Sequence, residues 1–117
     1  MGFNQGELVV GHTRTLYCSG QTAMSSDGKP QHAGDMAAQL ALSLENVEAV
    51  LTEAGMSLAN LVRLNVYTTD VDLLFEHYGI LASRLGAAGV APATTMLGVT
   101  RLAIPGQLVE LEATAVE

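Results

Sequence analysis

The chain has 117 residues, of which 49% are hydrophobic and 15% charged, and its 5 basic and 12 acidic side chains give a formal net charge of −7. Typical domains contain about 100 to 200 residues, so residues 1–117 are expected to form a single domain. The acidic balance argues against nucleic-acid binding, because Lys and Arg must neutralise phosphates, and aromatic residues for base stacking make up only 4% of the chain.

The chain contains one cysteine, Cys18, which excludes an internal disulfide and any cysteine-based metal motif, and indicates a reducing compartment. The N-terminal residues have neither the basic start nor the apolar core of a signal peptide. No run approaches the roughly 18 apolar residues of a membrane span. These features predict a cytoplasmic protein without a membrane partner.

Two short apolar segments, residues 7–10 and 15–19, flank Gly11–Arg14 and predict a β-hairpin. Ser19 and Gly20 come at the end of the second segment and mark a bend. Glycine at such a place permits a close approach that a side chain would block.

Helical periodicity begins after Asp35, which is a suitable N-cap, and Gly55 fits the left-handed position after the last turn. The apolar stripe of this helix consists of Met36, Leu40, Leu44, Val47 and Leu51. Residues 61–68 then alternate between apolar and polar and predict a strand. A second helix follows the cap Thr69-Asp70 and is ended by Gly86 and Gly89. Its stripe consists of Leu74, Tyr78, Leu81 and Leu85.

Residues 92–99 and 108–113 are two further apolar runs, predicted to be strands joined across residues 103–106. In the second run the odd positions are apolar, whereas Glu110 and Glu112 share the opposite face. Two carboxylates on one side of such a strand indicate either a face in contact with solvent or a functional site. Neighbours at i and i+2 point the same way and do not bracket a sugar as glycosidase carboxyls do, so one of them as a water-positioning base is the better functional interpretation.

The order strand, strand, helix, strand, helix, strand, strand predicts an α+β sandwich with both helices on one face of the sheet. This arrangement leaves the other face of the sheet uncovered. Since its strands are apolar, that face is expected to be an interface between copies of the chain.

The three histidines, His12, His32 and His77, show no metal-ligand spacing, and neither a metal site nor a cofactor is predicted. The first two are interpreted as surface residues in loops. His77 lies within one turn of Tyr78 and Leu81, so it is either a pocket residue or a helix residue at the margin of the core. The sequence has no glycine-rich phosphate loop and no serine-nucleophile elbow.

Five fragments of the sequence stand out when they are considered together. They are Ser19-Gly20-Gln21, Leu44 to Leu51 with Ala54-Gly55, Val62 to Tyr67, Pro92 to Thr95, and Val109 to Ala113. In order and spacing these fragments resemble the Rid family, also called YjgF/YER057c/UK114, the reactive intermediate deaminases. The resemblance extends from about Leu16 to the end of the sequence.

The resemblance implies a chorismate-mutase-like (YjgF-like) α+β fold with one mixed sheet, assembled as a homotrimer whose sheets form a central β-barrel with three clefts between subunits. Members of the family hydrolyse small enamines and imines such as 2-aminoacrylate without a metal or cofactor. In that chemistry an arginine binds the substrate carboxylate and a glutamate positions the attacking water. The resemblance assigns the catalytic role to Glu110, and it places Ser19, Gly20 and Met96 in the cleft lining.

The sequence departs from the family pattern at the position directly after Pro-Ala, where the family's deaminases carry arginine and this chain has Thr94. Threonine cannot replace a planar cation with five donors, so binding of anionic imines is expected to fall. The family's N-terminal tyrosine is matched by Phe3, and the asparagine of its second helix by His77. Arg101 lies seven residues from Thr94, a separation that predicts the opposite strand face.

These features predict a homotrimer that hydrolyses a small molecule less anionic than 2-aminoacrylate. Glu110 would position water, Thr94 and Ser19 would form hydrogen bonds to the ligand, and His77 would shuttle a proton. The alternative, from another functional class, is a non-catalytic small-molecule-binding or interaction trimer. An endoribonuclease is the third candidate, and the acidic balance opposes it.

Overall fold

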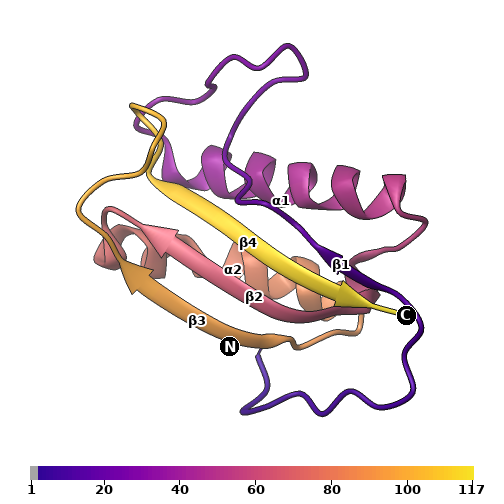
Figure 1. Cartoon of the computed structure of the whole chain (residues 1–117). Helices are drawn as coiled ribbons and strands as arrows, with labels where there is room; N and C mark the ends of the chain where they lie inside the picture. Colours follow the sequence, from indigo (N-terminus) through magenta and orange to yellow (C-terminus); the bar gives the residue numbers. More distant parts are fainter. Residues whose placement is uncertain (1–2) are drawn as a thin grey trace.

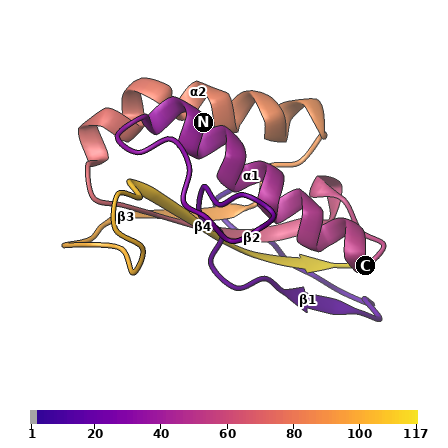
Figure 2. The ribbon, with the colours of Figure 1, turned by 90° about the horizontal axis from the view of Figure 1, so that it is seen from above.

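The computed structural model describes residues 3–117 and contains two helices on one face of a four-stranded sheet (Figures 1 and 2). The elements in chain order are β1 (Thr15–Tyr17), α1 (Met36–Glu53), a 3-10 turn η1 (Leu58–Asn60), β2 (Leu61–Thr68), α2 (Val71–Ala87), β3 (Ala93–Gly98) and β4 (Val109–Val116). The strand order is β1-β4-β2-β3, with β2 and β3 parallel and the other pairs antiparallel. The predicted α+β architecture with one mixed sheet is confirmed.

Both helices begin and end where their sequence signals lie. Asp35 accepts a hydrogen bond from the backbone N–H of Ala38 at 3.1 Å, and Asp70 caps α2 in the same way. Gly55 has φ of 73°, and the N–H of the following Met56 turns back to the carbonyl of Leu51 at 2.8 Å. These bonds satisfy backbone groups that a helix end leaves without partners.

The core lies between the helices and the face of the sheet that they cover. Along β4 the odd-numbered residues from Val109 to Ala115 are buried, and Leu64 and Val66 of β2 lie on the same side. The helices supply the other half of the core with the apolar stripes predicted from their periodicity. Helix α2 packs so closely on the sheet that a Cβ at Gly98 would lie 2.9 Å from a methyl group of Val71.

The predicted N-terminal hairpin is wrong. Residues 7–10 form no strand, and Leu8 and Val10 are 90% and 82% exposed. β1 pairs instead with the end of β4, where Leu16 lies opposite the buried Ala115. The eight-residue β4 offers β1 hydrogen bonds and a place for Leu16 at the core, which residues 7–10 cannot provide. The two C-terminal strands also do not pair with each other, because β2 lies between them.

The uncovered face of the sheet, here called the open face, is not the apolar surface expected from the sequence. The side chains that strand alternation and register assign to it include Tyr17, Arg63, Asn65, Tyr67, Thr95, Leu97, Glu110, Glu112 and Thr114. The expectation failed because most apolar residues of β2 and β4 lie on the helix side of the sheet. Exposed apolar area on the open face is limited to side chains such as Tyr17 and Leu97.

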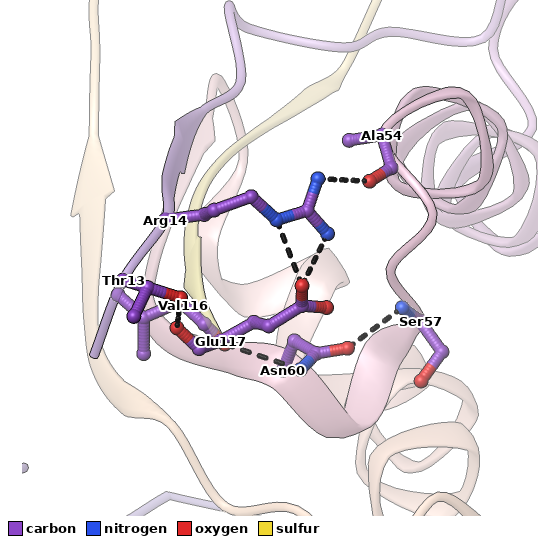
Figure 3. Close-up of polar contacts among 7 residues, drawn as sticks. All are labelled: Thr13, Arg14, Ala54, Ser57, Asn60, Val116 and Glu117. Atoms are coloured by element: carbon purple, nitrogen blue, oxygen red, sulfur yellow. Dashed lines mark hydrogen bonds and ion pairs between the residues drawn. The ribbon is translucent and has the colours of Figure 1, made fainter. Parts of the chain in front are cut away.

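A polar network ties the start of β1 to the end of β4 and to the C-terminus of α1 (Figure 3). The Arg14 guanidinium donates to Oε1 of Glu117 at 2.7 Å through Nε and to the carbonyl of Ala54 at 2.9 Å through Nη1. Asn60 adds a hydrogen bond from its amide to the carbonyl of Val116 at 3.1 Å. The network therefore anchors the short edge strand β1 at the end where it has few apolar contacts.

We expect Arg14→Met to lower the free energy of unfolding by about 1 kcal/mol, because a half-exposed ion pair and one hydrogen bond to a carbonyl each contribute about 1 kcal/mol or less. Urea unfolding at one fixed protein concentration measures this change. Arg101→Met is the matched control, since Arg101 is exposed and makes no ion pair within the described residues. Equal losses of unfolding free energy in the two variants would show that the hydrogen bonds and ion pair of Arg14 add nothing to stability beyond the effect of removing one positive charge.

Candidate functional site

Ser19, Gly20 and Glu110 lie together at the start of β4. The chain after β1 runs beside β4, with the N–H of Cys18 donating to the carbonyl of Ala113 at 2.8 Å. Further along, Gln21 and Leu111 exchange both backbone hydrogen bonds, at 2.7 and 2.9 Å. Gly20 is thereby held against the side chain of Glu110, and a Cβ at Gly20 would overlap the Glu110 carboxylate. The sequence predicted a close approach at Gly20, and the group that approaches it is the Glu110 carboxylate.

The two glutamates of β4 have different surroundings. Within residues 3–117 the side chain of Glu110 makes no hydrogen bond or ion pair, although it is half-buried. Oε1 of Glu112 accepts one hydrogen bond from the amide of Asn65 and one from the hydroxyl of Tyr67, both at 2.9 Å. Glu110 therefore has its oxygens available for water or a ligand, whereas Glu112 is held in place by its neighbours.

The hydrogen bonds from Asn65, and then from Tyr67, lower the pKa of Glu112 below its ordinary value. The same bond to Glu112 is the main reason that the pKa of Tyr67 is raised. Neither Asn65 nor Tyr67 was predicted from the sequence to be a functional residue. Their signal was present, since the alternation of residues 61–68 assigns both to the polar face of that strand.

Thr94 and Met96 lie away from Glu110 within one chain. They belong to β3, which is separated from β4 by β2. In the parallel register Thr94 is paired with Leu64 and Met96 with Val66, so both side chains lie on the helix side of the sheet. The hydroxyl of Thr94 donates to the carbonyl of Pro92 at 2.9 Å.

His77 lies on α2, half-buried, on the side of the sheet opposite to the open face that carries Glu110. A single chain therefore brings together Ser19, Gly20 and Glu110, and leaves the other predicted site residues apart from them. Among residues 3–117 no three His, Cys, Asp or Glu side chains gather in a way that could hold a metal ion.

Arg101 is not on a strand, so the expectation that it lies on the opposite strand face does not hold. It belongs to the connection between β3 and β4 and lines a hollow of about 400 Å³ together with Thr69 and Leu108. A second hollow of about 350 Å³ lies where α1 and α2 approach η1, beside the ion pair of Glu48 and Arg84. Neither hollow is lined by a predicted site residue.

Comparison with known proteins identifies the family of this chain. A family model described as Endoribonuclease L-PSP matches residues 3–117. The chain belongs to the Rid (YjgF/YER057c/UK114) family. Among its relatives, the mitochondrial protein mmf2 of Schizosaccharomyces pombe is 33% identical over 102 residues, which cover 87% of this chain and 79% of mmf2.

Two solved Rid-family structures have the same fold. The crystal structure of the Rid protein YyfB from Yersinia pestis has a TM-score of 0.84 and 33% identity, covering 99% of this chain and 87% of YyfB. Escherichia coli TdcF with bound serine has a TM-score of 0.79 and 26% identity, covering 98% of this chain and 87% of TdcF. Within the described residues of this chain, no helix is both long enough and apolar enough to cross a membrane.

Replacing Gly20 with Ala should displace the Glu110 side chain with little loss of stability, because the overlapping atoms are the far end of a flexible side chain. Any activity that depends on Glu110 should fall, while the unfolding transition in urea stays within about 0.5 kcal/mol of the wild type. Gly6→Ala is the control, because it adds the same methyl group at a position where nothing lies within 4 Å. A Gly20→Ala variant as active as wild type would contradict this contact.

Removing the Tyr67 hydroxyl should raise the pKa of Glu112 toward its ordinary value, because a bond to the charged form is lost. The lowered pKa means that ionised Glu112 favours folding above its unfolded-state pKa, and that this contribution disappears as the pH falls through the folded-state pKa. Carboxyl NMR titration of Tyr67→Phe measures the change directly. Tyr17→Phe, the same substitution at an exposed position of the open face, should leave the titration of Glu112 unchanged.

Proposed function

We propose that this Rid-family chain assembles as a homotrimer and hydrolyses small imines or enamines in clefts between subunits, with Glu110 positioning the attacking water. The observation that supports this proposal is the Glu110 carboxylate, which lies against Gly20 and has no hydrogen-bond partner in the described residues. A half-buried carboxylate with free oxygens can accept hydrogen bonds from a water molecule and orient it. Its neighbour Glu112 is already occupied and is less suited to this role.

In the proposed reaction, water adds its oxygen to the carbon of the C=N bond while one of its protons passes to Glu110. The nitrogen gains a proton, and the resulting carbinolamine collapses to a carbonyl compound and ammonia. One imine and one water are consumed for each carbonyl and ammonia released, so no oxidant, reductant or further reactant is needed. An enamine enters the same sequence after a proton is added to its carbon.

The separation of the site residues supports an assembly with more than one chain. Ser19, Gly20 and Glu110 lie at the start of β4, whereas Thr94 and Met96 lie on the edge strand β3. A neighbouring copy that brings its β3 to this β4 would complete the cleft. In such a trimer the open faces line a central β-barrel, and His77 has the role of a proton shuttle from the helix side.

A non-catalytic small-molecule-binding or interaction trimer is the second candidate, and Thr94 favours it, since the family's deaminases carry arginine at that position. The relative TdcF has serine bound in its crystal structure, which supports a small molecule as the ligand in either case. Endoribonuclease activity, named in the description of the family model, is less favoured by a net charge of −7. A cytoplasmic location remains a prediction.

Ammonia release from enzymatically generated imines tests the proposal with a matched pair of variants. Glu110→Gln should lower kcat by roughly 10²- to 10⁴-fold, the usual contribution of a positioned acid or base. Glu112→Gln changes the same charge two residues further along the same face and should retain most of the activity. Equal rates for wild type and Glu110→Gln would remove Glu110 from catalysis.

Two further measurements separate the candidate functions. Light scattering should give three times the mass of one chain at micromolar concentration, and a monomer would contradict the cleft. If the wild type releases no ammonia but Thr94→Arg does, the chain is a binding protein on a scaffold still capable of the reaction. If neither protein releases ammonia, imine hydrolysis is the wrong reaction.

A further inference from the structure

The segment that follows the site residue Gly20 is held by side-chain amides. This segment consists of residues 22–24, here called the clamped segment, and it forms no strand. Thr22 is only 7% exposed, so its backbone has little access to water. The amide of Asn46 on α1 donates to the carbonyl of Thr22 at 2.9 Å and to that of Met24 at 3.0 Å. One side chain therefore ties two carbonyls of the clamped segment to the helix.

Two further amides connect the clamped segment with the start of β4. Gln107, which is buried directly ahead of β4, accepts from the N–H of Ala23 at 2.9 Å and donates to its carbonyl at 3.3 Å. Gln39 of α1 donates to the carbonyl of Gly106 at 2.9 Å and accepts from the N–H of Leu108 at 2.6 Å. The clamped segment and the start of β4 are therefore attached both to α1 and to each other.

The spacing of these amides in the sequence explains why they act together. Gln39 and Asn46 are seven residues apart, which corresponds to two turns, so both lie on the same flank of α1. An amide side chain carries a donor and an acceptor and can replace the backbone partners that a strand would offer. Gly20 lies two residues before the clamped segment, and Glu110 lies three residues after Gln107. The amides therefore fix the relative position of two site residues.

We propose that Asn46 is a positioning residue for the Glu110 carboxylate and acts on it through the clamped segment and Gly20. Gly20 limits the space of the carboxylate, since a Cβ at this position would overlap it. When Asn46 no longer donates, the clamped segment and Gly20 can move away from β4, and Glu110 gains orientations that do not direct water at a substrate. The inference rests on the proposed function for the chemistry of Glu110, whereas the coupling between Asn46 and Gly20 is a property of the fold.

Asn46→Asp tests the positioning role, because it keeps the shape of the side chain and an ionised carboxylate cannot donate. It should lower kcat for ammonia release from enzymatically generated imines by roughly 10- to 100-fold, the effect of a small misplacement of a reacting group. KM should change less than about twofold, because Asn46 does not contact the substrate. Asn60→Asp is the matched control and should keep the wild-type kcat, since the Asn60 amide also donates to a carbonyl, that of Val116 at the other end of β4.

Hydrogen exchange measured by NMR follows the same coupling without requiring turnover. The N–H groups of Gln21 and Leu111 each donate to the carbonyl of the other residue, directly beyond Gly20. Both should exchange roughly 10-fold faster in Asn46→Asp, as the loss of a hydrogen bond predicts, and at the wild-type rate in Asn60→Asp. The N–H of Leu64 in the central strand β2 should stay slow in both variants, which shows that the fold is retained.

The outcomes are distinguishable from those of the proposed function. Faster exchange at Gln21 and Leu111 in Asn46→Asp alone supports the coupling, even if no protein releases ammonia and the hydrolytic proposal fails. Wild-type exchange at both amides, or equal losses of kcat in Asn46→Asp and Asn60→Asp, overturns the inference. Faster exchange with an unchanged kcat in an active protein overturns the positioning role. If Asn46→Asp does not fold, Asn46→Ser, which removes the same amide without adding a charge, is judged by the same measurements.

Discussion

Helices cover only one face of the sheet, and this constraint determines where most polar side chains of β2 and β4 lie, with the buried Thr68 as an exception. In a strand with a period of two, one set of residues is committed to the core, and the other set is left for whatever the open face meets. Leu111 and Ala113 fill the core, and Glu110 and Glu112 are placed together on the other side as a consequence. The two glutamates therefore lie on the open face because the alternate residues of β4 are buried in the core.

The same face gives its two carboxylates different properties through their neighbours. Glu112 faces the side chains of β2, where Asn65 and Tyr67 hold it in its ionised form. Glu110 is paired in register with Tyr67, whose hydroxyl donates to Glu112 instead, and on its other side it lies against Gly20, which offers no side-chain donor. Two chemically identical residues, two positions apart, therefore differ because both side-chain donors of β2 that reach this face donate to Glu112 and neither donates to Glu110.

Features with local causes could be predicted from the sequence. The caps at Asp35 and Asp70, the left-handed Gly55 and the alternation of residues 61–68 depend on residues within one turn or one strand, and all are present. The prediction of an N-terminal hairpin was wrong because β1 pairs with β4, although residues 7–10 have the local pattern of a strand. Pairing partners are chosen by burial, which a pattern in a single segment does not reveal.

The open face was mispredicted for a related reason. The composition of its strands is apolar on average. However, most apolar side chains face the helices, and the polar side chains lie on the uncovered face. A trimer built through this face therefore depends less on hydrophobic burial than the composition of the chain indicates, and more on polar contacts and on the edges of the sheet. Ser19 and Gly20 could be placed beside Glu110 only once the pairing of Gln21 with Leu111 was known.

β3 is an edge strand, so a molecule beside it can contact side chains from both faces of the sheet. In the interior of the sheet, the side chains of Thr94 and Thr95 would be divided by the backbone and would contact different surroundings. At this edge only an isolated bridge between Asn4 and Ala93 continues the sheet, and within the described residues no strand lies beyond Thr94 and Thr95. A molecule that packs against this edge can therefore contact side chains from both faces of the sheet.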